Sequence, residues 1–409
     1  MKKISLIAIT TFLGLFSSYA QDEVNPITTA APFLLIAPDA RGGGLADMGG
    51  ATSSDVSSLH YNAAKYAFAE SQWQIGLNYT PWLRNLTNDV SLTSLFVANK
   101  INERSAWASS LTYFSLGSIE LTDGGGISLG SENPNEFAID GAYSLKLSEV
   151  ISMAVGLRYI HSDMAVRVDN SEIQTVNTFA VDVSMFYQSE ELNYGSFNGR
   201  WRGGVNISNI GPKVELVLGG DESFIPTNFK VAGGFDFILD NANTITTNLE
   251  FNKLLVPTPP YRDSSGNVIS GMDDNVNFLK GMVQSWYDAP RGFEEEMEEF
   301  IWAFSSEYLY NEVFSIRAGY FHESANKGNR QFFTLGTGFK FRSTTLDISY
   351  LINASDVNNP LESTLRFSLT IKYSRSHPLS ERPAVWGEII TLGVVHKGWP
   401  LGKAGWTVS

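Results

Sequence analysis

The stretch DARGGGLADMGG, residues 39–50, is the part of the chain that looks most like a ligand-binding motif. A glycine-rich loop offers backbone N–H groups to an anion, and its nucleotide-binding form reads G-x-x-x-x-G-K-[ST] between a strand and a helix. Gly44 and Gly49 have this spacing, but Gly50 and Ala51 stand where the lysine and the hydroxyl residue belong. No apolar run with βαβ spacing surrounds the motif, so a dinucleotide fold fits no better. The glycines therefore need another explanation.

Other residue types that carry chemistry show no catalytic pattern. The histidines form no H-E-x-x-H or i,i+4 pair, which predicts no metal site. No G-x-S-x-G nucleophile elbow is present, although a Ser–His pair distant in sequence stays open. The acidic run EEEMEE at 294–299 matches no calcium loop, and such runs are usually solvated, the alternative being a cation or a basic partner. We predict a protein that is not an enzyme and uses no cofactor.

The amino end predicts export. Residues 1–20 hold two lysines, an apolar run at 4–16 and the small-x-small sequence SYA ending at Ala20, as in a signal peptide, so the mature chain is expected to start near Gln21. The chain has no cysteine, so the exported protein cannot rely on disulfides. Its formal net charge of −14 argues against a nucleic-acid partner, because phosphate binding needs clustered Lys and Arg.

Most of the chain alternates with a period of two. Examples are WQIGLNYT at 73–80 and FFTLGTGFKF at 332–341, where bulky apolar side chains alternate with small or polar ones, as on the two faces of a strand. A soluble β-sandwich would turn the apolar face inward, whereas a transmembrane barrel turns it outward to lipid. After residue 20 no apolar run reaches about 18 residues, so a membrane-spanning form must be a barrel.

The spacing of the alternating stretches favours the barrel. The connections between them alternate long and short, which is typical of outer-membrane barrels with long outside loops and short periplasmic turns. An even number of strands also returns both ends of the chain to the periplasm. We therefore predict, within residues 71–373, an all-β outer-membrane barrel of 14 antiparallel strands, near 72–80, 90–100, 104–116, 136–148, 150–162, 175–188, 199–210, 228–239, 243–254, 298–310, 312–323, 330–342, 344–353 and 363–373.

The two faces of one strand offer a test of this fold. Leu249→Arg should cost about 2–4 kcal/mol if the side chain meets the middle of the bilayer. Asn248→Arg, on the lumen face, should be far milder.

Residues 21–70 lack the alternation and contain the glycine-rich stretch. Glycines let a backbone turn tightly and pack close to a wall, which suits a plug folded into a barrel's lumen. About eight strands already close on side chains alone, so a wider lumen needs filling. Asp39 and Arg41 could pair there with lumen charges. The predicted plug motif comprises Pro38, Asp39, Arg41, Gly42, Gly43, Gly44 and Asn62.

The sequence APFLLIAPDARGGGLADMGGATSSDVSSLHYNAAKYAF, residues 31–68, resembles the N-terminal signature of the PorV family, outer-membrane barrels of the Bacteroidota type IX secretion system. That family is similar to the long-chain fatty-acid channels, which have 14 strands and an N-terminal plug. The resemblance runs from about Thr28 to Tyr373. Asn-Ala-Ala at residues 62–64 departs from the Asn-Pro-Ala common in such plugs, which puts a rigid turn at Ala63 in doubt.

The resemblance implies a non-enzymatic carrier in the outer-membrane lipid. Such a carrier binds the C-terminal signal domain of cargo leaving the SprA-type translocon and passes the cargo to the PorU sortase complex for attachment to the surface. The alternative is a transporter that lets hydrophobic small molecules past a movable plug. A channel should have an apolar track, whereas the expected inward residues are polar: Gln74, Asn78, Asn206, Asn248, Glu250, Arg366 and Lys372.

Two regions outside the alternation complete the prediction. The longest outside loop, 255–297, carries an apolar helical stripe that either packs on the barrel rim or binds a partner or cargo: Val276, Leu279, Met282, Val283 and Trp286. Residues 374–409 form a tail with three tryptophans and three prolines, to which the sequence assigns no role.

Overall fold

A computed structural model describes residues 24–82, 89–122, 124–164, 175–355 and 364–374. The predicted signal peptide, 1–20, and the tail from residue 375 onward lie outside this part of the chain. Within the described ranges, no helix is long and apolar enough to cross a membrane.

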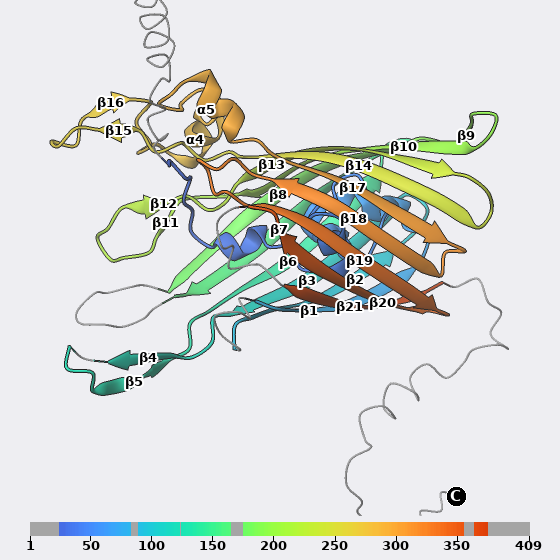
Figure 1. Cartoon of the computed structure of the whole chain (residues 1–409), viewed down its shortest axis with the longest axis horizontal. Helices are drawn as coiled ribbons and strands as arrows, with labels where there is room; N and C mark the ends of the chain where they lie inside the picture. The colour runs from blue at the N-terminus through green and yellow to red at the C-terminus, as the bar shows by residue number, and fades with distance from the viewer. Residues whose placement is uncertain (1–23, 83–88, 123, 165–174, 356–363, 375–409) are drawn as a thin grey trace, which may run out of the picture. The chain divides into compact units, whose positions relative to one another are not determined.

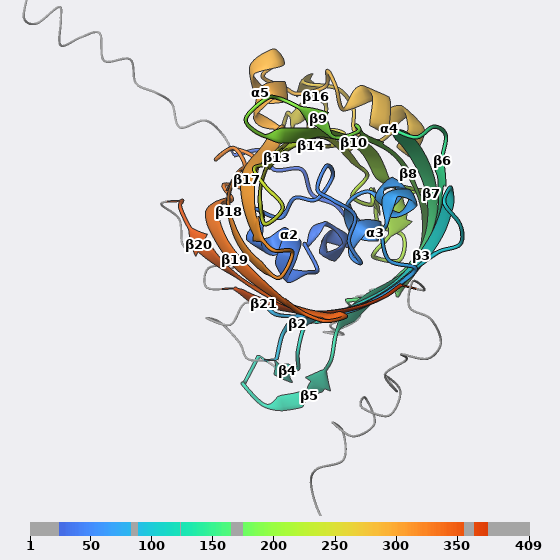
Figure 2. The same cartoon turned by 90° about the vertical axis from the view of Figure 1, so that its right-hand side faces the viewer.

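The chain forms a closed antiparallel β-barrel (Figures 1 and 2). Each barrel strand pairs with the next along the chain, and the last strand returns to the first, with Trp73 opposite Tyr373 and Tyr79 opposite Phe367. The prediction of 14 antiparallel strands is confirmed. The strands are β1 (Trp73–Pro81), β2 (Ser91–Lys100), β3 (Ser105–Ser115), β6 (Asn135–Lys146), β7 (Ile151–Asp163), β8 (Val176–Gln188), β10 (Asn198–Ile210), β13 (Asn228–Ile238), β14 (Asn243–Leu254), β17 (Ile301–Tyr310), β18 (Phe314–His322), β19 (Gln331–Phe341), β20 (Thr344–Asn353) and β21 (Leu365–Tyr373).

The two ends of the barrel differ in their connections (Figure 1). One end, called here the outer end, carries the long ones, with hairpins and helices of their own. At the other, inner end the strands join through short turns, apart from residues 189–197 with the small strand β9 (Leu192–Asn193). The outer-end elements are β4 (Ile119–Thr122), β5 (Ser128–Glu132), β11 (Val214–Glu215), β12 (Glu222–Ser223), β15 (Tyr261–Arg262), β16 (Val268–Ser270), α4 (Phe278–Gln284) and α5 (Phe293–Glu298).

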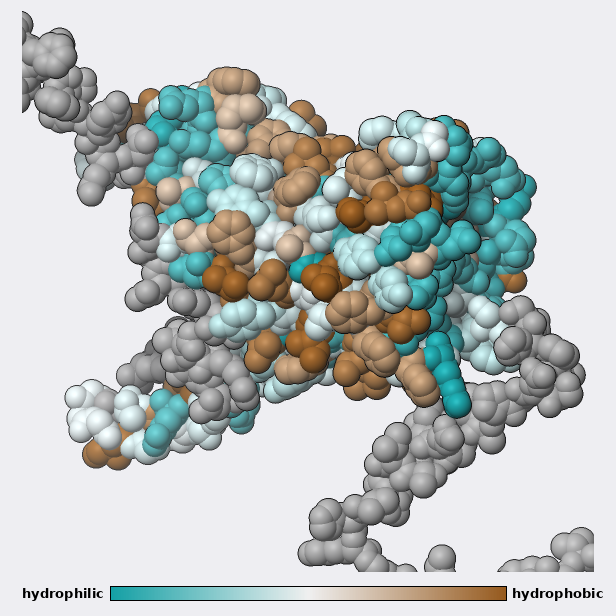
Figure 3. All heavy atoms as spheres, turned by 45° about the vertical axis from the view of Figure 1, so that its right-hand side comes forward, coloured by the Kyte–Doolittle hydropathy of each residue, from teal (hydrophilic) through white to brown (hydrophobic). Residues whose placement is uncertain are grey.

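Bulky apolar side chains point away from the lumen. Leu249 is 41% exposed and Phe339 53%, while Asn248 and Glu250, the neighbours of Leu249, are buried. Apolar residues gather across the middle of the barrel wall in the view of Figure 3, with more hydrophilic residues toward the ends. An apolar wall between polar ends is what a barrel in a lipid bilayer requires.

Residues 24–69, called here the lumen segment, begin among the connections at the outer end (Figure 1) and continue inside the ring of strands (Figure 2). Short helices arise because glycines, caps and a proline break the chain at close intervals. One of them, α2, packs against β18 to β21, while η2 packs against β2, β3, β6, β7 and β8. The helices are η1 (Pro32–Leu35), α2 (Ala40–Gly44), α3 (Ser58–Tyr61) and η2 (Ala63–Phe68).

The lumen segment starts at the outer end and finishes at the inner end. The Asn25 N–H donates to the carbonyl of Asn326, in the connection between β18 and β19 at the outer end. At the inner end, Lys100 donates its N–H to the carbonyl of Gln72, just before β1. The first strand begins and the last strand ends at this inner end, as an even number of strands requires, whereas Asn25 lies at the opposite end. The number of strands determines where the first and last strands end, but not the path of the lumen segment that precedes them.

The lumen interior divides into polar and apolar parts. Of the residues expected to face inward, Gln74, Asn78 and Arg366 are buried there. An apolar cluster of the lumen segment and the wall includes Phe33, whose ring stacks on Phe114 with centroids 6.3 Å apart. The prediction of a polar lumen therefore describes only part of it. That prediction used the inward residues of the strands and left out the aromatic residues of the lumen segment.

Candidate functional site

The three glycines of α2 stand where a side chain would collide with its surroundings. A Cβ at Gly42 would lie 2.0 Å from the Tyr61 hydroxyl oxygen, and one at Gly43 would lie 2.4 Å from an Arg366 guanidinium nitrogen. Gly44 lies against the backbone of Gly336 on β19, where a Cβ would come within 3.0 Å. These glycines let the helix approach both its own segment and the wall, the close packing expected of them from the sequence.

Two further glycines, Gly49 and Gly50, bind a carboxylate of the protein itself. The backbone N–H groups of Gly49 and Gly50 donate to one carboxylate oxygen of Glu250, on β14, at 3.2 and 2.8 Å. The other oxygen pairs with the Lys230 ammonium at 3.1 Å. The stretch that looks like a phosphate cradle thus presents its donors to a carboxylate of the wall.

Asp39 and Arg41 have different partners. The Asp39 carboxylate caps α2 by accepting from the Gly42 N–H, and it accepts from the Tyr61 hydroxyl, each at 2.9 Å. Its partners are therefore within the segment. Arg41 reaches the wall, pairing with Glu307 of β17 at 2.8 Å and with Asp55 at 2.7 Å.

The Arg41 contact extends into the wall as a chain of ion pairs. Glu307 is shared with Arg317 of β18 at 2.6 Å, and Arg317 pairs with Asp347 of β20 at 2.7 Å. A separate pair joins Arg366 of β21 to Asp47 at 2.6 Å. Buried charges need such partners, because an unpaired one carries a large desolvation cost.

The remaining predicted plug residues lie on either side of α2. Pro38 is buried just before it. Asn62 caps η2 by accepting from the Ala64 N–H at 3.1 Å and donates to the carbonyl of Met185 on β8 at 2.9 Å. With alanine rather than proline at residue 63, these bonds fix the turn. Its neighbour Lys65 is fully buried, donating to the Gly49 carbonyl at 2.7 Å.

Sequence reasoning missed the wall residues that hold the segment, namely Glu307, Arg317 and Asp347. The signal was available, because each occupies an inward position of its strand, where a charged residue in a period-two pattern needs a partner. What the strands could not indicate was the partner, which lies more than 260 residues away for Arg41 and Glu307.

At the outer end, α5 and the residue that follows it bury three carboxylates, those of Glu295, Glu296 and Glu299. The fully buried Lys253 ammonium lies 3.1 Å from Glu296 and also pairs with Glu299. Lys327 pairs with Glu295 at 2.7 Å and with Glu299 at 3.0 Å. The interpretation of the acidic run as a solvated face is therefore wrong for these three glutamates. Two lysines far away in sequence attract them into the loop's interior.

The same loop contains one carboxyl group in a poor environment for charge. Burial raises the pKa of Asp288 to about 6, with Glu296 and Glu299 adding to the rise and hydrogen bonds from Thr258 and Gln284 opposing it. Glu295 behaves in the opposite way. Burial alone would raise its pKa, but the hydrogen bond from Lys327, with other contacts, holds it below the usual range. The loop thus contains one carboxyl group with a raised pKa, Asp288, and one with a lowered pKa, Glu295.

The predicted stripe divides between the rim and solvent. Trp286 packs against the rings of Phe229 and Phe300, with centroids 5.6 and 6.2 Å away, while 43% of it stays exposed, and Val276 and Met282 are half-buried. Other apolar residues of the loop are exposed, up to 77% for Phe293. We call this set the docking face; it comprises Leu279, Val283, Tyr287, Phe293 and Met297.

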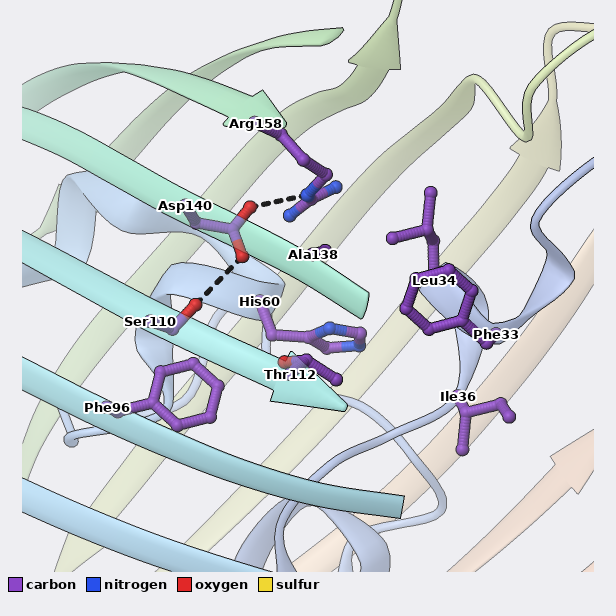
Figure 4. A pocket seen from close by; sticks show the side chains of 10 residues that line it. All are labelled: Phe33, Leu34, Ile36, His60, Phe96, Ser110, Thr112, Ala138, Asp140 and Arg158. Atoms are coloured by element: carbon purple, nitrogen blue, oxygen red, sulfur yellow. Dashed lines mark hydrogen bonds and ion pairs between the residues drawn. The ribbon is translucent and has the colours of Figure 1, made fainter. Parts of the chain in front are cut away.

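A small pocket opens between the lumen segment and the wall (Figure 4). Phe33, Leu34 and Ile36 of the segment line one side, while Asp140 and Arg158 lie on the wall. Arg158 pairs with Asp140, so the charges of the pocket already satisfy each other. Across the described part of the chain, no group of three His, Cys, Asp or Glu side chains is placed to hold a metal ion.

The chain is similar to several solved structures and to one protein-family model. No curated protein matches it. Among solved structures, a Pseudomonas aeruginosa FadL homologue is similar at 11% identity and a TM-score of 0.40, covering 86% of this chain and 99% of its own. The Ralstonia pickettii toluene transporter TbuX is similar at 9% identity and a TM-score of 0.45, and the match covers 83% of this chain and 100% of the transporter.

The family model described as "Type IX secretion system protein PorV" matches residues 19–261, more than half of the chain. These residues include the whole lumen segment and the barrel through β14. The chain therefore belongs to the PorV family, as an outer-membrane β-barrel component of the type IX secretion system.

Proposed function

We propose that this protein is a non-enzymatic carrier that binds the C-terminal signal domain of cargo leaving the SprA-type translocon and brings it to the PorU attachment complex. The chain enters the periplasm with a signal peptide cleaved after Ala20 and folds into the outer membrane. The carrier works through contacts between proteins, with the docking face as the cargo or partner site.

The exposed docking face is the observation that carries this proposal. A helix in water normally turns its charges outward, but α5 buries Glu295 and Glu296 and exposes Phe293 and Met297 beside the exposed Glu294. Exposed apolar patches on a rigid element mark sites of protein or membrane contact. The ion pairs with Lys253 and Lys327 fix the helix in this orientation, so the apolar side chains are held ready for a partner.

The lumen segment serves as a plug in this proposal. Its ion pairs with β17 and β21 and its glycine contacts with β19 hold it on one side of the barrel, and Asn62 holds it on the other. A carrier that works at its outer face needs a closed lumen, because an open one would breach the outer membrane.

Transport of a hydrophobic small molecule is the second candidate. The pocket beside Phe33 and Leu34 favours it, because apolar side chains of the segment line one side of it, opposite the paired Asp140 and Arg158 of the wall. A transport route through this pocket would require the segment to leave the wall, breaking the Arg41–Glu307 and Arg366–Asp47 pairs.

Deleting the gene and comparing the secreted and surface proteomes separates the two functions. Loss of many cargo proteins with C-terminal signal domains supports the carrier. Normal secretion together with impaired uptake of a hydrophobic compound supports the transporter and contradicts the carrier.

The docking face is tested in the same strain by complementation. Leu279→Asp with Phe293→Asp should leave barrel assembly intact and reduce both secretion and binding of a purified cargo C-terminal domain. The control is Leu218→Asp, which alters an exposed apolar side chain in a different outer connection. Equal binding by the two variants would remove the docking face from the proposal.

A further inference from the structure

We propose that the mature amino terminus lies on the cell surface, because the lumen segment threads the barrel from its outer to its inner end, and that Asn25 latches it there to the outer loop. The inference concerns the path of the chain and does not require the carrier function.

The contacts of the segment follow its path in order. Asn25 bonds the outer connections, and the Ala30 N–H donates to the carbonyl of Phe224, in the outer connection between β10 and β13, at 2.8 Å. Near the inner end, Ser144 and Ser152 donate their hydroxyls to the carbonyls of residues 63 and 64 at 2.6 and 2.7 Å. The Gln72 carbonyl then meets Lys100 at the inner turn. The chain therefore runs the length of the lumen before its first strand.

The few residues before Val24 cannot reverse this path. With cleavage before Gln21, three residues precede Val24, and a fully extended chain of three spans about 10 Å. The apolar band of such a barrel is about 25 Å tall, so the terminus cannot return to the inner end. Val24 itself is 63% exposed.

Asn25 is the latch between the segment and the loop. It is buried, and its side-chain amide donates to the Glu295 carboxylate at 3.0 Å and to the carbonyl of Pro259 at 3.1 Å. Glu295 is the same residue that pairs with Lys327 beneath α5. The helix that presents Phe293 and Met297 is thereby tied to the amino end of the plug, so displacing the loop would free the segment's outer end.

Because the natural chain has no cysteine, single cysteines report the topology directly. Val24→Cys should react with a membrane-impermeant maleimide in intact cells. Ser264→Cys, exposed between β15 and β16, should also react, whereas Glu149→Cys, in an inner turn, should react only after the outer membrane is opened. If the two controls behave in this way and Val24→Cys is protected until the membrane is opened, the threading is wrong. Reversed controls would instead show that the barrel has the opposite orientation, which also overturns the proposal.

The latch has its own measurement. Ser57→Cys places a nearly isosteric reporter in the lumen segment, where Ser57 is buried. Asn25→Asp sets a carboxylate against two acceptors and should raise the labelling rate of that reporter in the purified barrel about ten-fold, as expected for loss of a hydrogen bond to a charged group. Thr28→Val, an exposed change on the same segment, should leave the rate unchanged. Equal labelling rates for the Asn25→Asp variant and its parent would show that Asn25 does not act as a latch.

Discussion

The lumen segment and the outer loop both bury charged side chains, yet they differ in what they expose. In the lumen, the wall surrounds the segment and accepts Arg41 on Glu307, while glycines allow close contact with β19. In the outer loop, lysines draw the glutamates of α5 inward, and Phe293 is left in the open. Ion pairing fixes the orientation of both elements. Only the lumen segment has a protein surface covering its other side, which is why the loop is the region open to a partner.

The largest effect should come from the lumen. Glu307→Ala leaves Arg41 and Arg317 buried without their shared carboxylate, and breaking a buried pair on one side typically costs about 3–5 kcal/mol. Thermal unfolding in detergent measures this. The control, Asp273→Ala, removes a partner of the exposed Arg262 and should leave the unfolding temperature unchanged. Similar losses for both variants would mean that the lumen pairs are no stronger than surface ones.

The wall should be next in sensitivity. Leu249→Arg places a charge on the lipid-facing side and should cost about 2–4 kcal/mol in a bilayer. Refolding into lipid vesicles with denaturant titration gives the value, and Leu249→Phe is the control that keeps the side chain apolar. An Arg variant as stable as the Phe variant would mean that this face does not meet lipid.

Asn248, next to Leu249 on the same strand, shows what the period-two pattern predicts and what it does not. The period-two pattern correctly places Asn248 inside and Leu249 outside, because the pattern depends only on strand geometry. It also predicts a mild effect for an arginine inside, and that prediction took no account of what packs in the lumen. Gly234, on the neighbouring strand, has both Asn248 and the Ala51 carbonyl close by, so the segment fills this space. Strand periodicity contains no information on what occupies the lumen.

The same limit explains α5. Its sequence shows a dense acidic run, and local rules favour solvation for such runs. The partners, Lys253 and Lys327, come from β14 and from the connection after β18, so only the closed barrel brings them under the helix. Boundaries and pairing of the strands were predictable from local alternation and loop length. Contacts between the segment, the loop and the wall were not, because they join positions from 28 residues apart, as for Lys327 and Glu299, to 319 apart, as for Arg366 and Asp47.

A smaller loss should follow from filling a glycine. Gly42→Val would force a side chain into the Tyr61 hydroxyl, and overpacking of this kind typically costs about 1–3 kcal/mol. The matched control is Gly233→Val on the outward face of β13, where a Cβ meets no described atom within 4 Å. Heat-modifiable migration on gels compares the two barrels. If Gly42→Val unfolds no earlier than Gly233→Val, the segment is not packed tightly against its own α3.

The smallest effect concerns pH and belongs to the outer loop. The pKa of Asp288 is raised from 3.8 to about 6 by burial, so its charged form opposes folding of the loop. This penalty is absent below the unfolded pKa of 3.8, grows as the pH rises from 3.8 to about 6, and is complete above about pH 6. Asp288→Asn should therefore slow hydrogen exchange in residues 255–300 at about pH 8 and change it little at about pH 4.

Glu295 supplies the opposite sign within the same loop. Its lowered pKa means that the charged form stabilises the loop above the usual value of 4.5, and this stability is lost as the pH falls through the lowered pKa. Glu295→Gln should speed exchange at about pH 8, where Asp288→Asn slows it. Changes of the same sign in both variants would show that the two carboxyl groups share one environment. The orientation of α5 would then not depend on the pairing of Glu295 with Lys327.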